Sequence, residues 1–209
     1  MKILVVSPHT DDAELGSGGS ISKFIEEDHE IFWIVFSTCD VSLPAGYPRD
    51  ILRREFLQVL HSIGLIEEMC NIFEFRVRHL FEHRQDILEE LIQIRNEFKP
   101  DLVIAPSLND LHQDHQTVAN EVVRAFKTTS SIICYELPWN HMNFNTQLFV
   151  KLNESHISMK WKILRNYQSQ IQQNRTYFSE EFIRGLAKVR GIQCNAEYAE
   201  AFEVVRWIL

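Results

Sequence analysis

The 209-residue sequence lacks the cysteine pattern of a disulfide-stabilised protein or a structural zinc knot. Its four cysteines are widely scattered and include no Cys-x-x-Cys pair. They are Cys39, Cys70, Cys134 and Cys194. Reduced thiols in a cytoplasmic protein fit this pattern best, so we expect a cytoplasmic location.

Long apolar runs, a basic stripe, internal repeats and low-complexity tracts are also missing. No apolar run approaches the length of a membrane span, and Met1-Lys2 leads into a short strand without the flanks of a signal peptide. The formal net charge of −8 argues against a nucleic-acid partner, because phosphate contacts require clustered cations. We therefore expect no integral membrane segment, no nucleic acid, and a single domain spanning residues 1–209, with homo-oligomerisation left open.

Short apolar runs alternate with amphipathic segments, which is the pattern of a parallel sheet with crossover helices. The predicted fold is α/β: a single-domain, Rossmann-like three-layer sandwich with a mostly parallel sheet. The predicted strands are 2–7, 31–37, 71–75, 102–105, 132–135 and 202–205. The predicted helices are 13–27, 49–63, 84–98, 116–126, 158–170 and 180–190.

The most informative motif is His9-Thr10-Asp11-Asp12, directly after the apolar run Ile3-Leu4-Val5-Val6. Residues at the carboxyl end of a buried parallel strand lie where open α/β sheets bind ligands. Catalytic zinc takes three protein ligands, commonly imidazole and carboxylate, and leaves one position for water. His9, Asp12 and one further histidine would make such a set, and Asp11 could act as a base that is not itself a ligand.

A second cluster, His112-Gln113-Asp114-His115, follows the apolar run 102–106. Two histidines three residues apart project from the same face of a helical turn. The spacing allows two metal ligands, or one ligand and one protonated histidine that stabilises an oxyanion and protonates the leaving group. In either case Asp114 could hold a ring N–H.

Two other features have alternative interpretations. Gly16-Ser17-Gly18-Gly19 resembles a phosphate-binding loop, but it lacks the G-x-G-x-x-G order and the lysine of a P-loop, so close packing of the first helix is favoured. The segment 137–141 follows a strand, and its Trp139 offers either a surface on which sugars stack or a buried ring beside a hydrogen-bonded His141.

At these residues the chain closely resembles the PIG-L/LmbE-like family of zinc-dependent N-deacetylases, and the resemblance covers nearly the whole length. The two histidine-aspartate motifs are specific, and the remaining matches support them. The supporting matches are Leu15-Gly16-Ser17-Gly18-Gly19, Arg53-Arg54-Glu55, Ile63-Gly64, Tyr167-Gln168-Ser169-Gln170 and Tyr198-Ala199-Glu200-Ala201-Phe202.

The resemblance implies a role for each matched residue. His9, Asp12 and His115 would bind zinc, and Asp11 would be the general base. His112 would stabilise the oxyanion or act as an acid, and Asp114 would orient its histidine neighbour. Substrate contacts are expected from Tyr198 and, because Arg53-Arg54-Glu55 is out of register with the family's Arg-x-x-Glu spacing, more weakly from Arg53.

Thr10 and Gln113 stand where the family commonly has proline; neither replaces a reacting group, so we expect altered loop stiffness and retained chemistry. The expected function is hydrolysis of an acetamide, with an N-acetylglucosamine-type sugar or glycoconjugate as the small-molecule substrate and Zn²⁺ as the cofactor, other divalent metals being compatible with the ligands. The alternatives are hydrolysis of another amide or ester, and a non-catalytic protein that binds metal and carbohydrate.

Overall fold

The computed structural model describes residues 1–43 and 46–208, and within them the chain forms one seven-stranded sheet. The strands are β1 (Lys2–His9), β2 (Glu30–Ser37), β3 (Cys70–Ile72), β4 (Leu102–Pro106), β5 (Ser131–Tyr135), β6 (Leu148–Leu152) and β7 (Tyr198–Arg206). Their order across the sheet is β3-β2-β1-β4-β5-β7-β6. Pairings among β1 to β5 are parallel, whereas β7 runs antiparallel to both β5 and β6.

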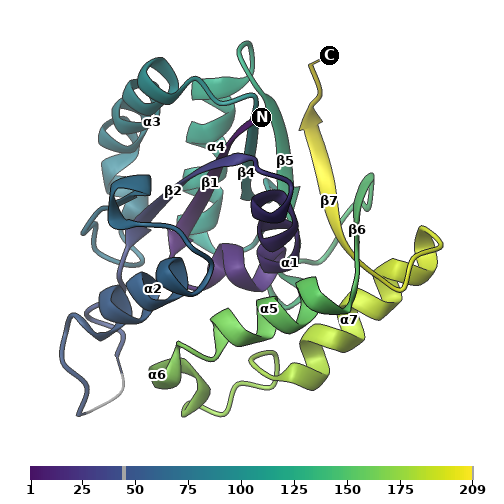
Figure 1. Cartoon of the computed structure of the whole chain (residues 1–209). Coiled ribbons are helices and arrows are strands. Elements are labelled where there is room, and N and C mark those ends of the chain that lie inside the picture. The colour runs from purple at the N-terminus through teal and green to yellow at the C-terminus, as the bar shows by residue number, and fades with distance from the viewer. Residues whose placement is uncertain (44–45, 209) are drawn as a thin grey trace.

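Helices cover both faces of the sheet (Figure 1). The α-helices are α1 (Asp12–Glu26), α2 (Ile51–Ser62), α3 (Arg84–Phe98), α4 (Gln113–Phe126), α5 (Glu154–Leu164), α6 (Gln168–Ile171) and α7 (Glu180–Gln193). Three short 3₁₀ helices join them: η1 (Glu67–Met69), η2 (Leu80–His83) and η3 (Pro138–Asn140). Among these described residues, no helix combines the length and apolar character that crossing a bilayer requires.

The alternation of side chains along the central strand divides the core in two. Ile3 and Val5 of β1 pack with α1, α2, α5 and α7, whereas Leu4 and Val6 pack with α3 and α4 on the opposite face. Successive side chains of a strand point to opposite faces, so a fully buried strand needs apolar residues at every position. This arrangement confirms the predicted α/β three-layer fold with a mostly parallel sheet.

Each predicted strand and helix corresponds to an element of the structure, with bounds shifted by a few residues. Three differences are larger: β6 is not among the predicted strands, the predicted strand 71–75 ends at Ile72 in β3, and the predicted helix 158–170 is two helices, α5 and α6, separated at residues 165–167. That break carries the buried side chain of Tyr167 into the interior. One domain over residues 1–209 stays a prediction, and residues 44, 45 and 209 of that span lie outside the described residues.

Strand order also places the functional edge of the sheet. The chain leaves β1 toward β2 on one side, and β4 lies on its other side, which makes the β1/β4 boundary a topological switch point. Open α/β sheets bind ligands in the crevice outside the carboxyl ends of the strands at such a point. The two histidine-aspartate motifs follow β1 and β4, so they meet there.

Candidate metal centre and active site

The turn from β1 to α1 supplies the first two polar side chains of the site. His9 is the last residue of β1 and Asp12 is the first residue of α1. The backbone N–H of His9 donates to Asp12 Oδ2 over 2.9 Å, which closes the turn on itself. Both side chains are buried, so the turn presents an imidazole and a carboxylate at the same point.

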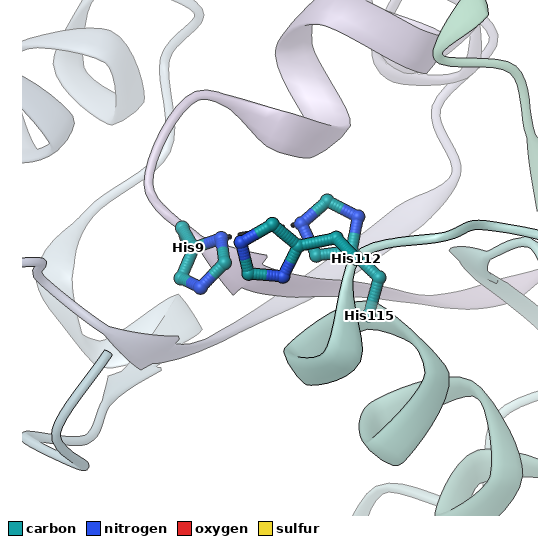
Figure 2. Close-up of side chains that lie close together, drawn as sticks. All are labelled: His9, His112 and His115. Atoms are coloured by element: carbon teal, nitrogen blue, oxygen red, sulfur yellow. Dashed lines mark hydrogen bonds between the residues drawn. The ribbon is translucent and has the colours of Figure 1, made fainter. Parts of the chain in front are cut away.

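The amino end of α4 supplies two more imidazoles. His112 is the N-cap residue of α4, where its Nδ1 accepts from the backbone N–H of Asp114 over 3.2 Å. His115 lies in the first turn of the helix and is buried. Figure 2 shows His9, His112 and His115 gathered at the end of β1, although the two motifs are about a hundred residues apart in the sequence.

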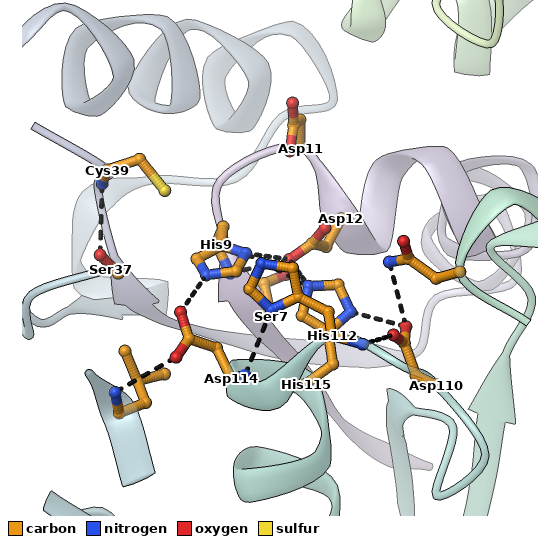
Figure 3. A network of polar contacts seen from close by, with 12 residues as sticks. Ser7, His9, Asp11, Asp12, Ser37, Cys39, Asp110, His112, Asp114 and His115 are labelled. Carbon is orange, nitrogen blue, oxygen red and sulfur yellow. Dashed lines mark hydrogen bonds and ion pairs between the residues drawn. The ribbon is translucent and has the colours of Figure 1, made fainter. Parts of the chain in front are cut away.

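Three donor atoms form a nearly equilateral triangle (Figure 3). The Oδ2 atom of Asp12 lies 3.1 Å from Nδ1 of His9 and 3.2 Å from Nε2 of His115, and those two nitrogens are 3.2 Å apart. Donors about 2.0–2.2 Å from a tetrahedral zinc are separated by roughly 3.3–3.6 Å, so this triangle, slightly smaller, is close to one face of such a site. His9, His112 and His115 form another possible set, with donor atoms within 4.8 Å of one another, but Nδ1 of His112 accepts the Asp114 N–H. The triangle, whose sides are all 3.1–3.2 Å, is therefore the candidate ligand set.

Two aspartates contact the other ring nitrogens of His9 and His115, the two candidate ligand imidazoles. Oδ2 of Asp114 lies 2.9 Å from His9 Nε2, and Oδ2 of Asp110 lies 2.7 Å from His115 Nδ1. A carboxylate that receives the second ring N–H of a histidine sets the tautomer and leaves the other nitrogen free to bind metal. The orienting role expected of Asp114 stays a prediction, and the structure places its carboxylate against His9, whereas the carboxylate beside His115 is that of Asp110.

His112 lines the candidate site without belonging to the triangle. Its ring is half-buried, with its centroid 5.0 Å from that of His9 and 4.7 Å from that of His115. Burial and the two neighbouring histidines lower the pKa of His112 to about 4. Since Nδ1 accepts the Asp114 N–H, the neutral ring carries its proton on Nε2 and keeps one hydrogen-bond donor.

Asp11 differs from its neighbour Asp12 in both backbone and partners. It is the N-cap residue of α1 with φ 80° and ψ −22°, a left-handed conformation that costs a non-glycine residue about 1–3 kcal/mol. Its carboxylate makes no hydrogen bond within the described part of the chain, and Figure 3 shows it apart from the joined His9 and Asp12. Burial, followed by the charges of Asp12 and Glu14, raises the pKa of Asp11.

A cavity of about 330 Å³ opens on this cluster. The cavity is lined by five residues of the two motifs: His9, Asp11, Asp12, His112 and His115. It is also lined by residues outside the predicted site. Among these are Arg78, Trp139, Gln170, Arg175 and Tyr177.

An aromatic pair forms part of the cavity wall. The rings of Trp139 and Tyr177 stack with centroids 3.9 Å apart and an interplanar angle of 12°, and Trp139 is 37% exposed. Arg175 Nη1 donates to the hydroxyl of Tyr177 over 2.8 Å. The Trp139 ring is therefore partly exposed at the cavity, as in the first of its two predicted alternatives. The hydrogen bond of the second alternative is also present, because His141 Nδ1 lies 2.7 Å from the carbonyl oxygen of Leu137. Arg175 and Tyr177 lie between α6 and α7, where no sequence motif marks them.

The structure does not bring the two expected substrate-binding residues to this cavity. Arg53 borders a different cavity, with Asp50 and Glu74 among its neighbours. Tyr198 begins β7, where the ammonium of Lys188 lies 5.0 Å from its ring centroid. Both residues matched only the supporting motifs, and neither lines the cavity around the histidine cluster.

Comparisons with known proteins agree with this geometry. Residues 4–126, more than half of the chain, match the PIG-L family, described as GlcNAc-PI de-N-acetylase, and the chain therefore belongs to this family of deacetylases. A relative from Escherichia coli (strain K12), the uncharacterized deacetylase YaiS, is 26% identical over 171 residues, which is 80% of this chain and 90% of the relative.

Solved structures show the same fold at lower sequence identity. The N,N'-diacetylchitobiose deacetylase of Pyrococcus horikoshii superposes with a TM-score of 0.80 at 20% identity, covering 98% of this chain and 83% of that one. GalB of Pseudomonas putida KT2440, a 4-carboxy-2-hydroxymuconate hydratase, superposes equally well, with a TM-score of 0.80 at 18% identity and coverage of 100% and 97%. The fold therefore occurs with more than one reaction, and the site must decide the chemistry.

Proposed function

We propose that the protein is a zinc-dependent hydrolase that removes the N-acetyl group from an N-acetylglucosamine-type sugar or glycoconjugate. The products are acetate and a free amine. The observation that carries this proposal is the donor triangle of His9, Asp12 and His115 beside the Asp11 carboxylate, which has no hydrogen bond among the described residues, in a chain of a de-N-acetylase family. A cytoplasmic location, expected from the cysteine pattern, is part of the proposal.

The ligand set fits a catalytic zinc ion. Two imidazoles and one carboxylate leave one tetrahedral position open, which distinguishes catalytic from structural zinc sites. When bound, the ion polarises a carbonyl and lowers the pKa of water toward neutrality. Asp110 and Asp114 hold the ligand rings in the tautomers that this binding needs.

The chain's own residues supply the proton transfers. Asp11 takes the proton from the attacking water, since its carboxylate is the acidic group of the cavity with no hydrogen bond among the described residues. The Nε2–H of His112 donates to the oxygen that becomes negative as the tetrahedral intermediate forms. An amide nitrogen leaves only when protonated, and Asp11, having received a proton, can return it there.

The remaining walls fit a sugar ring. A volume of about 330 Å³ is at the small end of ligand cavities, so it suits one acetamido sugar with the rest of a larger substrate outside. Trp139 and Tyr177 offer aromatic surface beside the reacting group, and Arg175 adds hydrogen-bond donors. We assign these three residues, in place of Arg53 and Tyr198, to substrate binding.

The test is an acetate-release screen over N-acetylated monosaccharides, chitooligosaccharides and their glycosides, using zinc-loaded protein and chelator-treated protein. Asp11→Asn should keep its bound zinc and lose about 10²–10⁴-fold in kcat, the range for a general base. His115→Ala should instead lose zinc. Wild-type turnover by the Asp11 variant would reject the assigned base.

The same screen tests the competing candidate, a protein that binds metal and carbohydrate without turnover. Zinc-dependent sugar binding with no acetate from any compound would favour that candidate. The free carboxylate of Asp11 argues against it, because a pure binding site has no need of an additional unligated acid.

A further inference from the structure

We propose that Tyr167, held by Glu14, is a positioning residue that fixes the backbone of Asp11 and thereby directs its carboxylate at the substrate. The expected effect on catalysis rests on the proposed function, in which Asp11 is the general base. The contact itself is a property of the fold: the hydroxyl of Tyr167 accepts the backbone N–H of Asp11 over 3.2 Å and donates to Glu14 Oε1 over 2.6 Å.

The positions along α1 show what this contact replaces. Asp11 is the N-cap residue, so Glu14 is the third residue of the helix. In a capping box, the side chain at that third position bonds directly to the N–H of the N-cap residue, and the N-cap side chain accepts the N–H of the third residue. Here the tyrosine hydroxyl stands between Glu14 and the Asp11 N–H, and the Asp11 side chain makes no capping bond.

The interposed hydroxyl accounts for the unusual state of Asp11. An N-cap residue normally has an extended backbone, which brings its side chain over the helix end. Asp11 has φ 80° instead, and its carboxylate lines the cavity. The tyrosine therefore bonds the N–H of Asp11 in a conformation that leaves the carboxylate uncommitted, which is the condition a general base requires.

The Tyr167 hydroxyl is held in place by two hydrogen bonds and by the buried position of its ring. Tyr167 and Glu14 are both fully buried, and the ring of Tyr167 packs edge-on against Phe178 at a centroid distance of 6.4 Å. A hydroxyl has one proton, and because that proton goes to Glu14, a lone pair is left to face Asp11. Glu14 thus sets the direction of the bond, and the break between α5 and α6 sets its place.

Tyr167→Phe removes the hydroxyl and keeps the ring, and Tyr135→Phe is the matched control. Tyr135 is equally buried in the same core cluster, but its hydroxyl bonds to the carbonyl of Val6 at 3.3 Å and does not contact Asp11. We expect Tyr167→Phe to lower kcat by about 10–100-fold with KM and zinc content unchanged, the cost of misplacing a reacting group. Tyr135→Phe should stay within about threefold of wild type.

A second pair of variants tests the role of Glu14. Glu14→Gln keeps a carbonyl acceptor for the tyrosine hydroxyl and should retain most of kcat. Glu14→Leu removes the acceptor and should lose about as much as Tyr167→Phe. Equal losses in the glutamine and leucine variants would contradict the directing role of Glu14.

Amide hydrogen exchange of Asp11, measured by NMR, makes the test independent of any substrate. Exchange should accelerate by about tenfold or more in Tyr167→Phe and stay unchanged in Tyr135→Phe, because only the first loses the acceptor. Unchanged exchange in Tyr167→Phe, or equal kcat losses in the two phenylalanine variants, would overturn the inference. Faster exchange in a protein that releases no acetate would refute the proposed function and leave the positioning contact standing.

Discussion

Asp110 and Asp114 contact the two candidate ligand imidazoles, His115 and His9, at the ring nitrogens that point away from the donor triangle. Asp114 is fully buried and also accepts the backbone N–H groups of Arg78 and Leu80, at 2.6 and 3.2 Å. Asp110 additionally accepts the backbone N–H of His112 at 2.8 Å. Each carboxylate therefore ties a candidate metal ligand to the backbone of a loop, so the proposed donor atoms are already held in place by the protein. Such preorganisation lowers the cost of ordering the ligands on binding.

Arg175 replaces Arg53 as the proposed substrate-binding arginine, because Arg175 lines the cavity at the histidine cluster and Arg53 does not. Arg175→Ala should raise KM by about tenfold with a smaller effect on kcat, because a side chain at the cavity wall contributes similar binding to the substrate and the transition state. The measurement is steady-state acetate release. Arg53→Ala is the matched control, since Arg53 lines a separate cavity and its loss should leave KM unchanged. A larger KM effect at Arg53 would restore the choice made from the sequence.

At the scale of elements, the small residues of α1 allow the helix to approach its neighbours. A Cβ atom added at Gly16 would lie 2.5–2.8 Å from side-chain atoms of Tyr135, and one at Gly19 would lie 2.6 Å from Leu152. These distances are shorter than van der Waals contact, so the glycines are required by packing. This supports close packing, the favoured interpretation of Gly16-Ser17-Gly18-Gly19, over a phosphate-binding loop. Close packing also fixes the amino end of α1, where Asp12 lies.

Gly16→Ala should lower the free energy of unfolding by about 1–3 kcal/mol, the usual cost of overpacking a core. Gly185→Ala, in the middle of α7, is the control, because an added Cβ there meets nothing within 4 Å. That variant should be more stable than wild type by about 0.5–1 kcal/mol, since alanine loses less backbone freedom in a helix. Chemical denaturation measures both. A neutral Gly16→Ala would show that α1 can move away from β5 at little cost.

Elements were predictable wherever the local pattern and the tertiary role coincide. β1, β2 and β4 carry nearly continuous apolar runs because both faces of the sheet are covered, and α3 has an apolar stripe. β6 was missed although it contains the apolar run Leu148-Phe149-Val150, because it is a short edge strand whose residues are mostly only partly buried, and a run of that length does not by itself identify a strand. The candidate histidine and aspartate ligands could be selected from the sequence because they lie in two contiguous motifs that follow strands. Trp139 follows a strand and was predictable as one of two alternatives, whereas Arg175 and Tyr177 were not, because only tertiary packing brings the α6–α7 connection to the cavity.

At the scale of the whole molecule, the candidate metal centre joins the two halves of the fold. His9 and Asp12 come from the β1–α1 turn, α1 packs on one face of the sheet, and His115 comes from α4 on the other face. An ion bound to all three therefore links segments about a hundred residues apart in the chain. GalB has the same fold and is a hydratase, so the fold alone does not identify a deacetylase. A metal ion that links the two motifs is therefore the feature to test for the proposed zinc-dependent deacetylase.

Zinc should therefore raise the thermal stability of the protein. A ligand that binds only the folded state at 1,000 times its Kd adds about 4 kcal/mol. A domain of this size gains roughly 2–4 °C in Tm per kcal/mol, so zinc should raise Tm by roughly 8–16 °C over chelator-treated protein. His115→Ala is the control, because it keeps the fold but breaks the triangle, and its Tm should not respond to zinc. An equal response in that variant would place the ion elsewhere and remove the link between the two motifs on which the proposed chemistry depends.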